Sequence, residues 1–172
     1  HINAAAAVTP INLLALALLA TPRQTALEPE LRQQLEMLLA VLKAMPYDAR
    51  VTVTPKTPAE IIDYGVELQV VTREKHRAGE FVRMTPENAV LATYYRNNVL
   101  HLVAMPSMIA CCFISNSALR TADVQRLAWR IYPYISAELF LRWPEAELPA
   151  VTERALHALG ELGLLEHAPG TD

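Results

Sequence analysis

The sequence predicts a mainly α-helical protein with one small β-hairpin, arranged in winged-helix-like units. Helix starts are marked three times by a threonine that can cap a helix, followed by a proline suited to its first position. These pairs are Thr9-Pro10, Thr57-Pro58 and Thr85-Pro86. Leucines recur at the three-and-four spacing of one helical face over residues 30–44. Two short runs of strand-forming residues flank a turn that contains Gly79.

The first 84 residues are predicted to form three helices and then the hairpin. No charged side chain occurs from Ile2 to Ala20, but Pro10 divides that run. The helix that begins at Thr9 is therefore too short to cross a membrane and is expected to lie in a core. The other elements expected here are helices over Glu30–Ala44 and Thr57–Gln69, and strands at Val70–Thr72 and Phe81–Met84.

The second half is predicted to be helical throughout. A helix that begins at Thr85 is expected to reach about Ala104, because Pro106 would interrupt it. A helix from Thr121 toward Tyr132 is expected to break or kink at Pro133 for the same reason. The further helices expected are Ser107–Ile114 and Pro149–Leu165, and Ala137–Trp143 is expected to continue after Pro133 as an aromatic, amphipathic turn.

Three helices followed by a hairpin is the order of elements in a winged-helix unit. We therefore expect a winged-helix-like unit over residues 1–84 and a second helical unit over 85–172, which stops before a second wing. One compact domain is the alternative. The chain begins at His1 without an initiator methionine, so we expect a piece of a longer protein. Winged-helix units bind DNA or serve as packing modules, so the fold alone does not decide the function.

Composition limits the classes of function. The chain is 52% hydrophobic and 19% charged, so part of its surface is expected to face a partner domain or a membrane. Its formal net charge of −3 provides no basic field for nucleic acid. The two cysteines, Cys111 and Cys112, are adjacent, and we interpret them as reduced core residues that form neither a disulfide framework nor a zinc site.

A search for catalytic residues gives no candidate. His76 is expected in the hairpin turn, and His157 lies on the last helix without a partner nucleophile or metal-ligand pattern. His167 and Asp172 match the acyltransferase pattern His-x-x-x-x-Asp, but the Ala-Pro-Gly-Thr tetrapeptide between them cannot hold a base in register with its carboxylate. No glycine-rich phosphate loop or serine elbow occurs, and the sequence indicates no cofactor or metal.

Two polar and aromatic groups remain as candidates for substrate binding or for a domain interface. The first is the run Tyr94, Tyr95, Arg96, Asn97 and Asn98, with His101 four residues after Asn97. The second is the pair Arg142 and Trp143. Arginine suits phosphate recognition, so Arg96 could contact a phosphate. The alternative is an ion pair with a carboxylate such as Glu138 that fixes helix packing, and for His101 it is a hydrogen-bonded core position.

Blocks of sequence in consistent order resemble the region after the acyltransferase domain in bacterial membrane-associated glycerol-3-phosphate acyltransferases. The tyrosine-arginine-asparagine and leucine-arginine-tryptophan blocks are the most specific of them. Together the blocks cover nearly the whole chain: Val8–Leu19, Thr21–Gln24, Glu87–Leu91, Thr93–Asn98 with His101, Pro106–Ala110, Ile131–Tyr134 and Ala137–Trp143.

The resemblance implies an enzyme that moves an acyl group from acyl-coenzyme A or acyl carrier protein to glycerol 3-phosphate. Its product is lysophosphatidate, at the first step of phospholipid synthesis. The family's catalytic His-x-x-x-x-Asp block and phosphate-binding arginines lie upstream of the matched region, so no catalytic residue is carried over. The resemblance thus implies a helical part, inactive alone, that packs on an α/β acyltransferase domain of a peripheral enzyme on the cytoplasmic side of the inner membrane.

Two other classes of function stay open at this point. A DNA-binding or protein-interaction module is suggested by the winged-helix-like order of elements. The predicted third helix argues against DNA, because it carries Glu60, Asp63 and Glu67 and has only Lys56 as a nearby base. Direct membrane attachment could use the apolar Ile2–Ala20 or Val99–Ile114 segments, but neither has the basic flanks of an interfacial anchor.

Overall fold

The computed structural model describes residues 2–116 and 118–166 of the chain. These residues form two compact units. Unit 1 holds residues 2–40 and 48–100, and unit 2 holds residues 41–47, 101–116 and 118–166. The predicted domain boundary between residues 84 and 85, like the alternative of one compact domain, stays a prediction.

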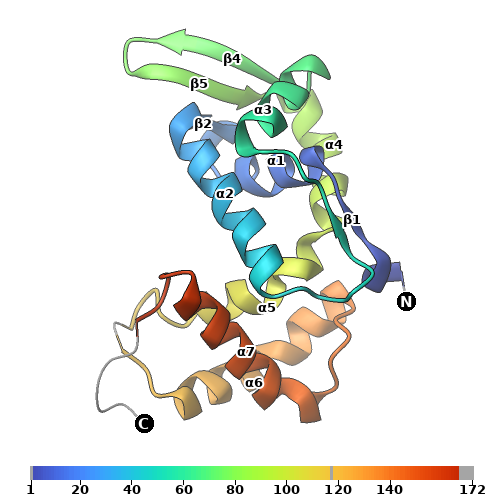
Figure 1. Ribbon diagram of the computed structural model, residues 1–172, viewed down its shortest axis with the longest axis vertical. Helices are drawn as coiled ribbons and strands as arrows, with labels where there is room; N and C mark the ends of the chain where they lie inside the picture. Colours follow the sequence, from blue (N-terminus) through green and yellow to red (C-terminus); the bar gives the residue numbers. More distant parts are fainter. Residues whose placement is uncertain (1, 117, 167–172) are drawn as a thin grey trace. The chain divides into compact units, whose positions relative to one another are not determined.

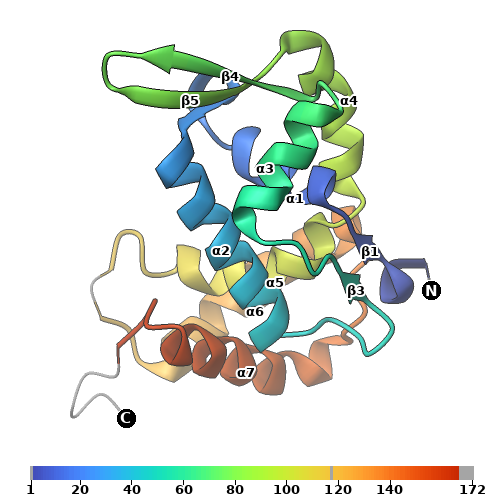
Figure 2. The same cartoon turned by 45° about the horizontal axis from the view of Figure 1, so that its top comes forward.

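Unit 1 is built around the short buried helix α1 (Pro10–Leu18), with further helices beside it (Figure 1, Figure 2). These are α2 (Glu28–Ala44), whose last residues belong to unit 2, α3 (Pro58–Glu67) and α4 (Pro86–Asn97). The predicted threonine–proline helix starts are confirmed. At α1 the Thr9 hydroxyl accepts from the Asn12 N–H, and the Asn12 side chain accepts from the Thr9 N–H. Thr57 with Glu60 forms the same capping box at α3.

A three-stranded antiparallel sheet lies at one end of unit 1 (Figure 1). Strands β4 (Val71–His76) and β5 (Gly79–Met84) form the predicted hairpin, which is confirmed and is longer than expected. The third strand, β2 (Thr25–Leu27), pairs with β5 and gives the order β2-β5-β4. Three residues are too few to produce an alternating pattern, so the sequence did not predict β2.

Shorter elements complete unit 1. Two-residue strands β1 (Ala7–Val8) and β3 (Thr52–Val53) pair in parallel, and single 3₁₀ turns precede β1 and β2. Leucine and isoleucine side chains from the helices and apolar side chains from the inner face of the sheet make up the core. The fully buried ones are Leu13, Leu14, Leu18, Leu31, Leu35, Ile61, Ile62, Val71, Val82 and Met84. The core therefore lies between the sheet and the helices of this unit.

Unit 2 is helical in its described residues. Most of α5 (Leu100–Cys111) belongs to it, followed by α6 (Thr121–Leu139), the 3₁₀ turn η3 (Glu145–Glu147) and α7 (Leu148–Glu161). Helices α6 and α7 pack against each other. Their buried side chains include Val124, Ala128, Tyr132, Val151, Ala155 and Leu159.

Two helix boundaries predicted from prolines were wrong. The helix from Thr85 ends at Asn97, and a new helix runs from Leu100 through Pro106, so Ser107–Ile114 is not a separate helix. Two successive asparagines, which are weak helix formers, lie at the real break. Pro106 costs α5 one hydrogen bond, but most side chains around it are buried, and that packing stabilises the helix through the proline.

Pro133 likewise lies inside α6, which is continuous from Thr121 to Leu139. The first residues of the amphipathic turn predicted over Ala137–Trp143 therefore belong to α6. α6 ends where Phe140 adopts the left-handed conformation, with φ 51°, and Trp143 lies beyond it. The fold class is thus mainly helical with small sheets, as predicted. Within residues 2–116 and 118–166, no helix has both the length and the apolarity needed to span a bilayer.

Candidate functional site

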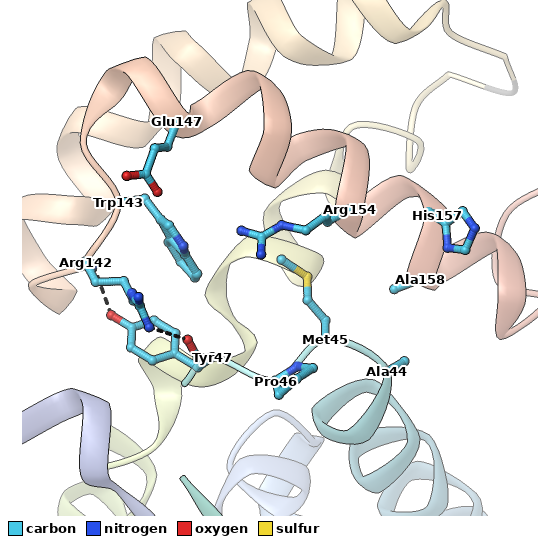
Figure 3. Close-up of a pocket in the computed structure, with 10 residues that line it drawn as sticks. All are labelled: Ala44, Met45, Pro46, Tyr47, Arg142, Trp143, Glu147, Arg154, His157 and Ala158. Carbon is cyan, nitrogen blue, oxygen red and sulfur yellow. Dashed lines mark hydrogen bonds between the residues drawn. The ribbon is translucent and has the colours of Figure 1, made fainter. Parts of the chain in front are cut away.

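An open cleft in unit 2 brings together three segments of the chain (Figure 3). Residues 44–47 come from the end of α2 and just after it, residues 142–147 follow α6, and α7 supplies the third wall. The cleft has a volume of about 340 Å³. Its lining residues are Ala44, Met45, Pro46, Tyr47, Arg142, Trp143, Glu147, Arg154, His157 and Ala158.

Tyr47 is the centre of a buried aromatic cluster beside the cleft. Its ring meets the His101 ring edge-on, with 5.0 Å between centroids and an interplanar angle of 85°. It meets Trp143 at 4.9 Å and 69°. Edge-to-face contacts of this kind stabilise by about 0.5–1.5 kcal/mol beyond the burial of area. The cluster therefore fixes the position of Tyr47 and of one wall of the cleft.

Arg142 is held by Tyr47 in three ways. Its main-chain N–H donates to the Tyr47 phenolic oxygen at 3.0 Å, and its Nη1 donates to the Tyr47 carbonyl at 2.9 Å. Its Cζ also lies 5.9 Å from the centroid of the Tyr47 ring, at cation–π distance. The guanidinium is consequently oriented at the rim of the cleft before any ligand arrives.

Trp143 is held from the other side by Tyr132 of α6. The Tyr132 hydroxyl donates a hydrogen bond to the Trp143 carbonyl. Burial raises the pKa of Tyr132 above its ordinary value, which keeps the hydroxyl protonated as a donor. Trp143 is 8% exposed, so it acts as a buried anchor and offers the cleft little aromatic surface. The Arg142-Trp143 pair thus combines an oriented charge with a packing residue.

The charges of the cleft come from α7 as well. Arg154 extends its guanidinium over the cleft near Met45 (Figure 3). His157 lies one turn further along α7, and its Nδ1 is 3.5 Å from Glu161 Oε2. Glu147 is the only carboxylate of the lining and stands at the N-cap position of α7, where the helix dipole favours a negative charge. The lining therefore carries two guanidinium groups, one imidazole and one carboxylate.

This set of groups suits recognition of charge more than a chemical step. The contact between His157 and Glu161 pairs an imidazole with a carboxylate, but their side chains are 74% and 67% exposed, so water screens the pair. A general base is usually held in position by a less exposed partner. Among the described residues, no three histidine, cysteine or acidic side chains are grouped so that they could hold a metal ion.

The sequence-predicted site residues fall into both units. Tyr94 to Asn98 lie at the end of α4 in unit 1, where Tyr94 is 68% exposed. The Arg96 Nε and Nη2 atoms donate to Asn97 Oδ1 at 3.2 Å and 3.1 Å. The predicted pairing of Arg96 with Glu138 would join the two units and stays a prediction.

His101, Arg142 and Trp143 are brought together in unit 2 through a residue that the sequence did not indicate. His101 is 3% exposed and lies in the core of unit 2. Tyr47 contacts all three, yet the sequence indicates only a polar connecting stretch there. The one available signal was a large aromatic residue directly after Pro46.

Two other histidine expectations can be placed. His76 is in strand β4 rather than in the turn, and its ring packs against Phe81 at 5.9 Å. His167 and Asp172, which formally match the acyltransferase pattern, lie outside the described residues. Arg154 was missed because it is one of several charges on the outer face of a leucine-striped helix, and nothing in the spacing separates it from them.

Comparison with known proteins gives a consistent result along the chain. Residues 1–171 match the model of the family described as "Glycerol-3-phosphate acyltransferase C-terminal region". The chain is 44% identical over 172 residues to a glycerol-3-phosphate acyltransferase of Xanthomonas axonopodis pv. citri, covering 100% of the chain and 19% of that relative. Identity is 43% over 171 residues to the Pseudomonas paraeruginosa protein of that description, covering 99% of the chain and 20% of the relative.

A third relative, the glycerol-3-phosphate acyltransferase of Xylella fastidiosa strain M12, is 42% identical over 165 residues, which is 96% of the chain and 19% of the relative. The chain thus spans about a fifth of the length of the curated relatives that it matches. No solved structure matches it significantly.

Proposed function

The chain belongs to the family of the glycerol-3-phosphate acyltransferase C-terminal region, and we propose that it serves as the non-catalytic part of such an enzyme. The proposed reaction moves an acyl group from acyl-coenzyme A or acyl carrier protein to the first hydroxyl of sn-glycerol 3-phosphate. The product is lysophosphatidate, and the reaction is the first step of phospholipid synthesis. The observation that carries the proposal is the family match over residues 1–171.

The non-catalytic role is supported by the chemistry of the described residues. The cleft of unit 2 has groups that recognise charge, and its imidazole–carboxylate contact is exposed. The relatives are about five times longer than this chain, which leaves room for an acyltransferase domain outside it. We therefore assign the catalytic base to that domain and expect this chain alone to be inactive.

Helix α4 is the proposed contact with the acyltransferase domain. One face of α4 packs on α1, while Val90, Leu91 and Tyr94 on the opposite face are 69%, 51% and 68% exposed. These three positions follow the spacing of one helical face. Exposed apolar side chains grouped in this way are typical of an interaction surface. Tyr95 and the polar residues Asn97 and Asn98 continue this surface toward the end of the helix.

Unit 1 is further proposed to be a winged-helix-like packing module. Apart from the two-residue strands β1 and β3, its chain order is α1, β2, α2, α3 and the β4–β5 hairpin, and the pairing of β2 with β5 supports this assignment. The alternative of DNA binding is disfavoured, because Glu60, Asp63 and Glu67 are exposed on α3. Lys56, the nearby base, lies over the Tyr64 ring at 5.6 Å. The negative charges of these three acidic side chains would repel the phosphate backbone of DNA.

The proposed location is the cytoplasmic side of the inner membrane, as a peripheral protein. Attachment is proposed to use a surface of the complete enzyme. The proposed partners are the acyltransferase domain of the same polypeptide, the two substrates and the membrane surface.

A chimera tests the function directly. The chain would replace the corresponding C-terminal segment of the Xanthomonas relative, to which it is 44% identical. Transfer of a labelled acyl group from acyl-coenzyme A to glycerol 3-phosphate is expected from the chimera and not from the isolated chain. An isolated chain that is folded by circular dichroism and transfers acyl groups would contradict the non-catalytic role. A soluble but inactive chimera would contradict the family role.

The same chimera tests the α4 contact. Leu91→Lys places a charge within the exposed apolar stripe, so we expect a loss of activity or of stable assembly with the acyltransferase domain. The matched control is Glu36→Lys on the exposed face of α2, which is expected to behave like the unmodified chimera. Equal activity of the two variants would place the domain interface elsewhere.

A further inference from the structure

We propose that the cleft of unit 2 is a phosphate-binding site in which Arg142 and Arg154 hold the phosphate oxygens. The two arginines come from different segments, the connection after α6 and the helix α7, and both line one cleft (Figure 3). Arginine presents several N–H donors in a planar fork that matches phosphate geometry. Neither the family description nor the relatives' names assign a binding site to these residues.

Arg142 supplies the preorganised half of the site. Its backbone and its Nη1 are both bound to Tyr47, at 3.0 Å and 2.9 Å, and Tyr47 is fixed in turn by its aromatic contacts. A long side chain that is already ordered loses less conformational entropy when it binds a ligand. The bonds to Tyr47 leave the guanidinium at the rim of the cleft, where Arg142 remains exposed to solvent.

Arg154 supplies the second positive charge. It is exposed, and it forms no hydrogen bond or ion pair with any residue in the described ranges 2–116 and 118–166. Glu147, the acidic residue of the lining, stands at the start of α7, where the helix dipole stabilises its charge without Arg154. The lining therefore brings two guanidinium groups together with a single carboxylate, although the chain carries a net charge of −3.

The dimensions of the cleft fit a small phosphate compound or the head of a larger one. A volume of about 340 Å³ lies near the lower end of the range for ligand pockets, roughly 300–1,000 Å³. The exposed Ala44 and Pro46 provide the apolar part of the lining for the carbon chain attached to the phosphate, since Met45 and Trp143 are buried. The opening to solvent would let the rest of a coenzyme A or of a lipid remain outside.

Phosphate of this kind has two possible sources, a soluble phosphate compound or a phospholipid headgroup. The choice of glycerol 3-phosphate and coenzyme A as soluble probes rests on the proposed function. Titration calorimetry of the chain would use inorganic phosphate, glycerol 3-phosphate and coenzyme A at constant ionic strength. Flotation with vesicles of neutral phospholipid, with and without an anionic phospholipid, would probe the headgroup.

The deciding comparison is between two arginines of unit 2. Arg154→Gln removes a cleft charge, and Arg130→Gln removes another exposed charge, from α6 outside the cleft. We expect Arg154→Gln to weaken binding of the best phosphate probe about tenfold, because a charge-assisted hydrogen bond contributes at least the ~1.4 kcal/mol that this factor requires. Arg130→Gln is expected to leave binding within about twofold of the parent chain.

The outcomes separate cleanly. Saturable binding of a soluble phosphate that depends on Arg154 supports the site and identifies a soluble ligand. Vesicle binding that depends on Arg154 and on anionic lipid supports it and identifies a headgroup. Absence of binding to every probe, or an equal effect of the two substitutions, overturns it. An active chimera with no phosphate binding in the cleft would refute this inference alone, whereas an inactive chimera would refute the proposed function.

Discussion

Arg142 makes two hydrogen bonds to a single residue, Tyr47. The Arg142 main-chain N–H donates to the Tyr47 hydroxyl, and the Arg142 Nη1 donates to the Tyr47 carbonyl. These bonds join the segment after α2 to the segment after α6, which are 95 residues apart in the chain. Together with the ring contact between Tyr47 and Trp143, this pair therefore joins two of the walls of the cleft in unit 2.

Replacing Tyr47 by phenylalanine tests this link. Tyr47→Phe retains the ring contacts with His101 and Trp143 but removes the acceptor for the Arg142 N–H. We expect a loss of about 0.5–1.5 kcal/mol in the free energy of unfolding, measured with urea. Tyr134→Phe is the control, because Tyr134 is 76% exposed in the same unit. Equal stability of the two variants would mean that the Tyr47 hydroxyl contributes nothing.

The helix starts and the hairpin could be predicted because their signals are local. A threonine followed by proline encodes a capped helix within four residues, and all three such predictions were confirmed. The helix boundary predicted from Pro106 failed because long-range packing decided the outcome. A buried helix can tolerate the loss of one hydrogen bond, and the sequence of the helix alone does not report its burial.

The cleft was predictable only in part, for the same physical reason. Arg142 and Trp143 belong to a distinctive block of sequence, which makes them candidates without any structure. Tyr47 and Arg154 lie about 95 and 12 residues away from Arg142, and only the folded chain brings them to it. No local spacing rule connects residues from three separate segments.

Asn12 provides a second test of a buried polar contact. Its side chain is buried, and Nδ2 donates to the Tyr95 carbonyl at 2.7 Å while Oδ1 accepts from the Thr9 N–H at 2.8 Å. Asn12→Ala leaves both partners unpaired, so we expect a loss of about 1–3 kcal/mol in the free energy of unfolding. Thermal and urea unfolding would measure it. Asn98→Ala, at an exposed position of the same unit, should cost far less, and a comparable cost would contradict the role of Asn12.

Glu28 predicts how the stability of unit 1 depends on pH. Its carboxylate accepts from Arg73 Nε at 2.7 Å and also from Arg32, and Arg73 reaches on to Asp63 at 2.7 Å. The hydrogen bonds from Arg73, followed by those from Arg32, lower the pKa of Glu28 below its ordinary 4.5, although burial opposes them.

Because the pKa of Glu28 is lowered in the folded state, its contribution to stability must decrease at acid pH. The stabilisation from Glu28 is complete above the pKa that Glu28 has in the unfolded chain, near 4.5. It is lost as the pH falls through the lower pKa that Glu28 has in the folded chain. Glu28→Gln should therefore reduce the free energy of unfolding at pH 7 by about 1–3 kcal/mol and make it less sensitive to pH below 4.5. The control is Glu30→Gln, an exposed residue of the same helix turn. A parallel pH dependence for Glu28→Gln and the parent chain would refute the argument.

The ends of α3 and α7 offer a reciprocal experiment on the left-handed conformation. Gln69 follows α3 with φ 57°, and Gly163 follows α7 with φ 67°. Each closes its helix through the same pair of main-chain bonds. The Gln69 N–H donates to the Val66 carbonyl and the Gly163 N–H to the Gly160 carbonyl, and in both cases the N–H of the next residue donates to the carbonyl one residue before that acceptor. Glycine adopts this conformation without the steric cost that a side chain introduces.

Gln69→Gly is therefore expected to stabilise the chain by up to about 1 kcal/mol, and Gly163→Gln is expected to destabilise it by a similar amount. Neither position is buried, and nothing lies within 4 Å of a Cβ built on Gly163, so packing does not confuse the comparison. Urea unfolding of both variants would show whether the free energy of unfolding rises for Gln69→Gly and falls for Gly163→Gln. Gln69→Ala separates the effect of conformation from the loss of the glutamine side chain, because alanine keeps the Cβ. If Gln69→Ala stabilised as much as Gln69→Gly, the left-handed strain would not be the cause.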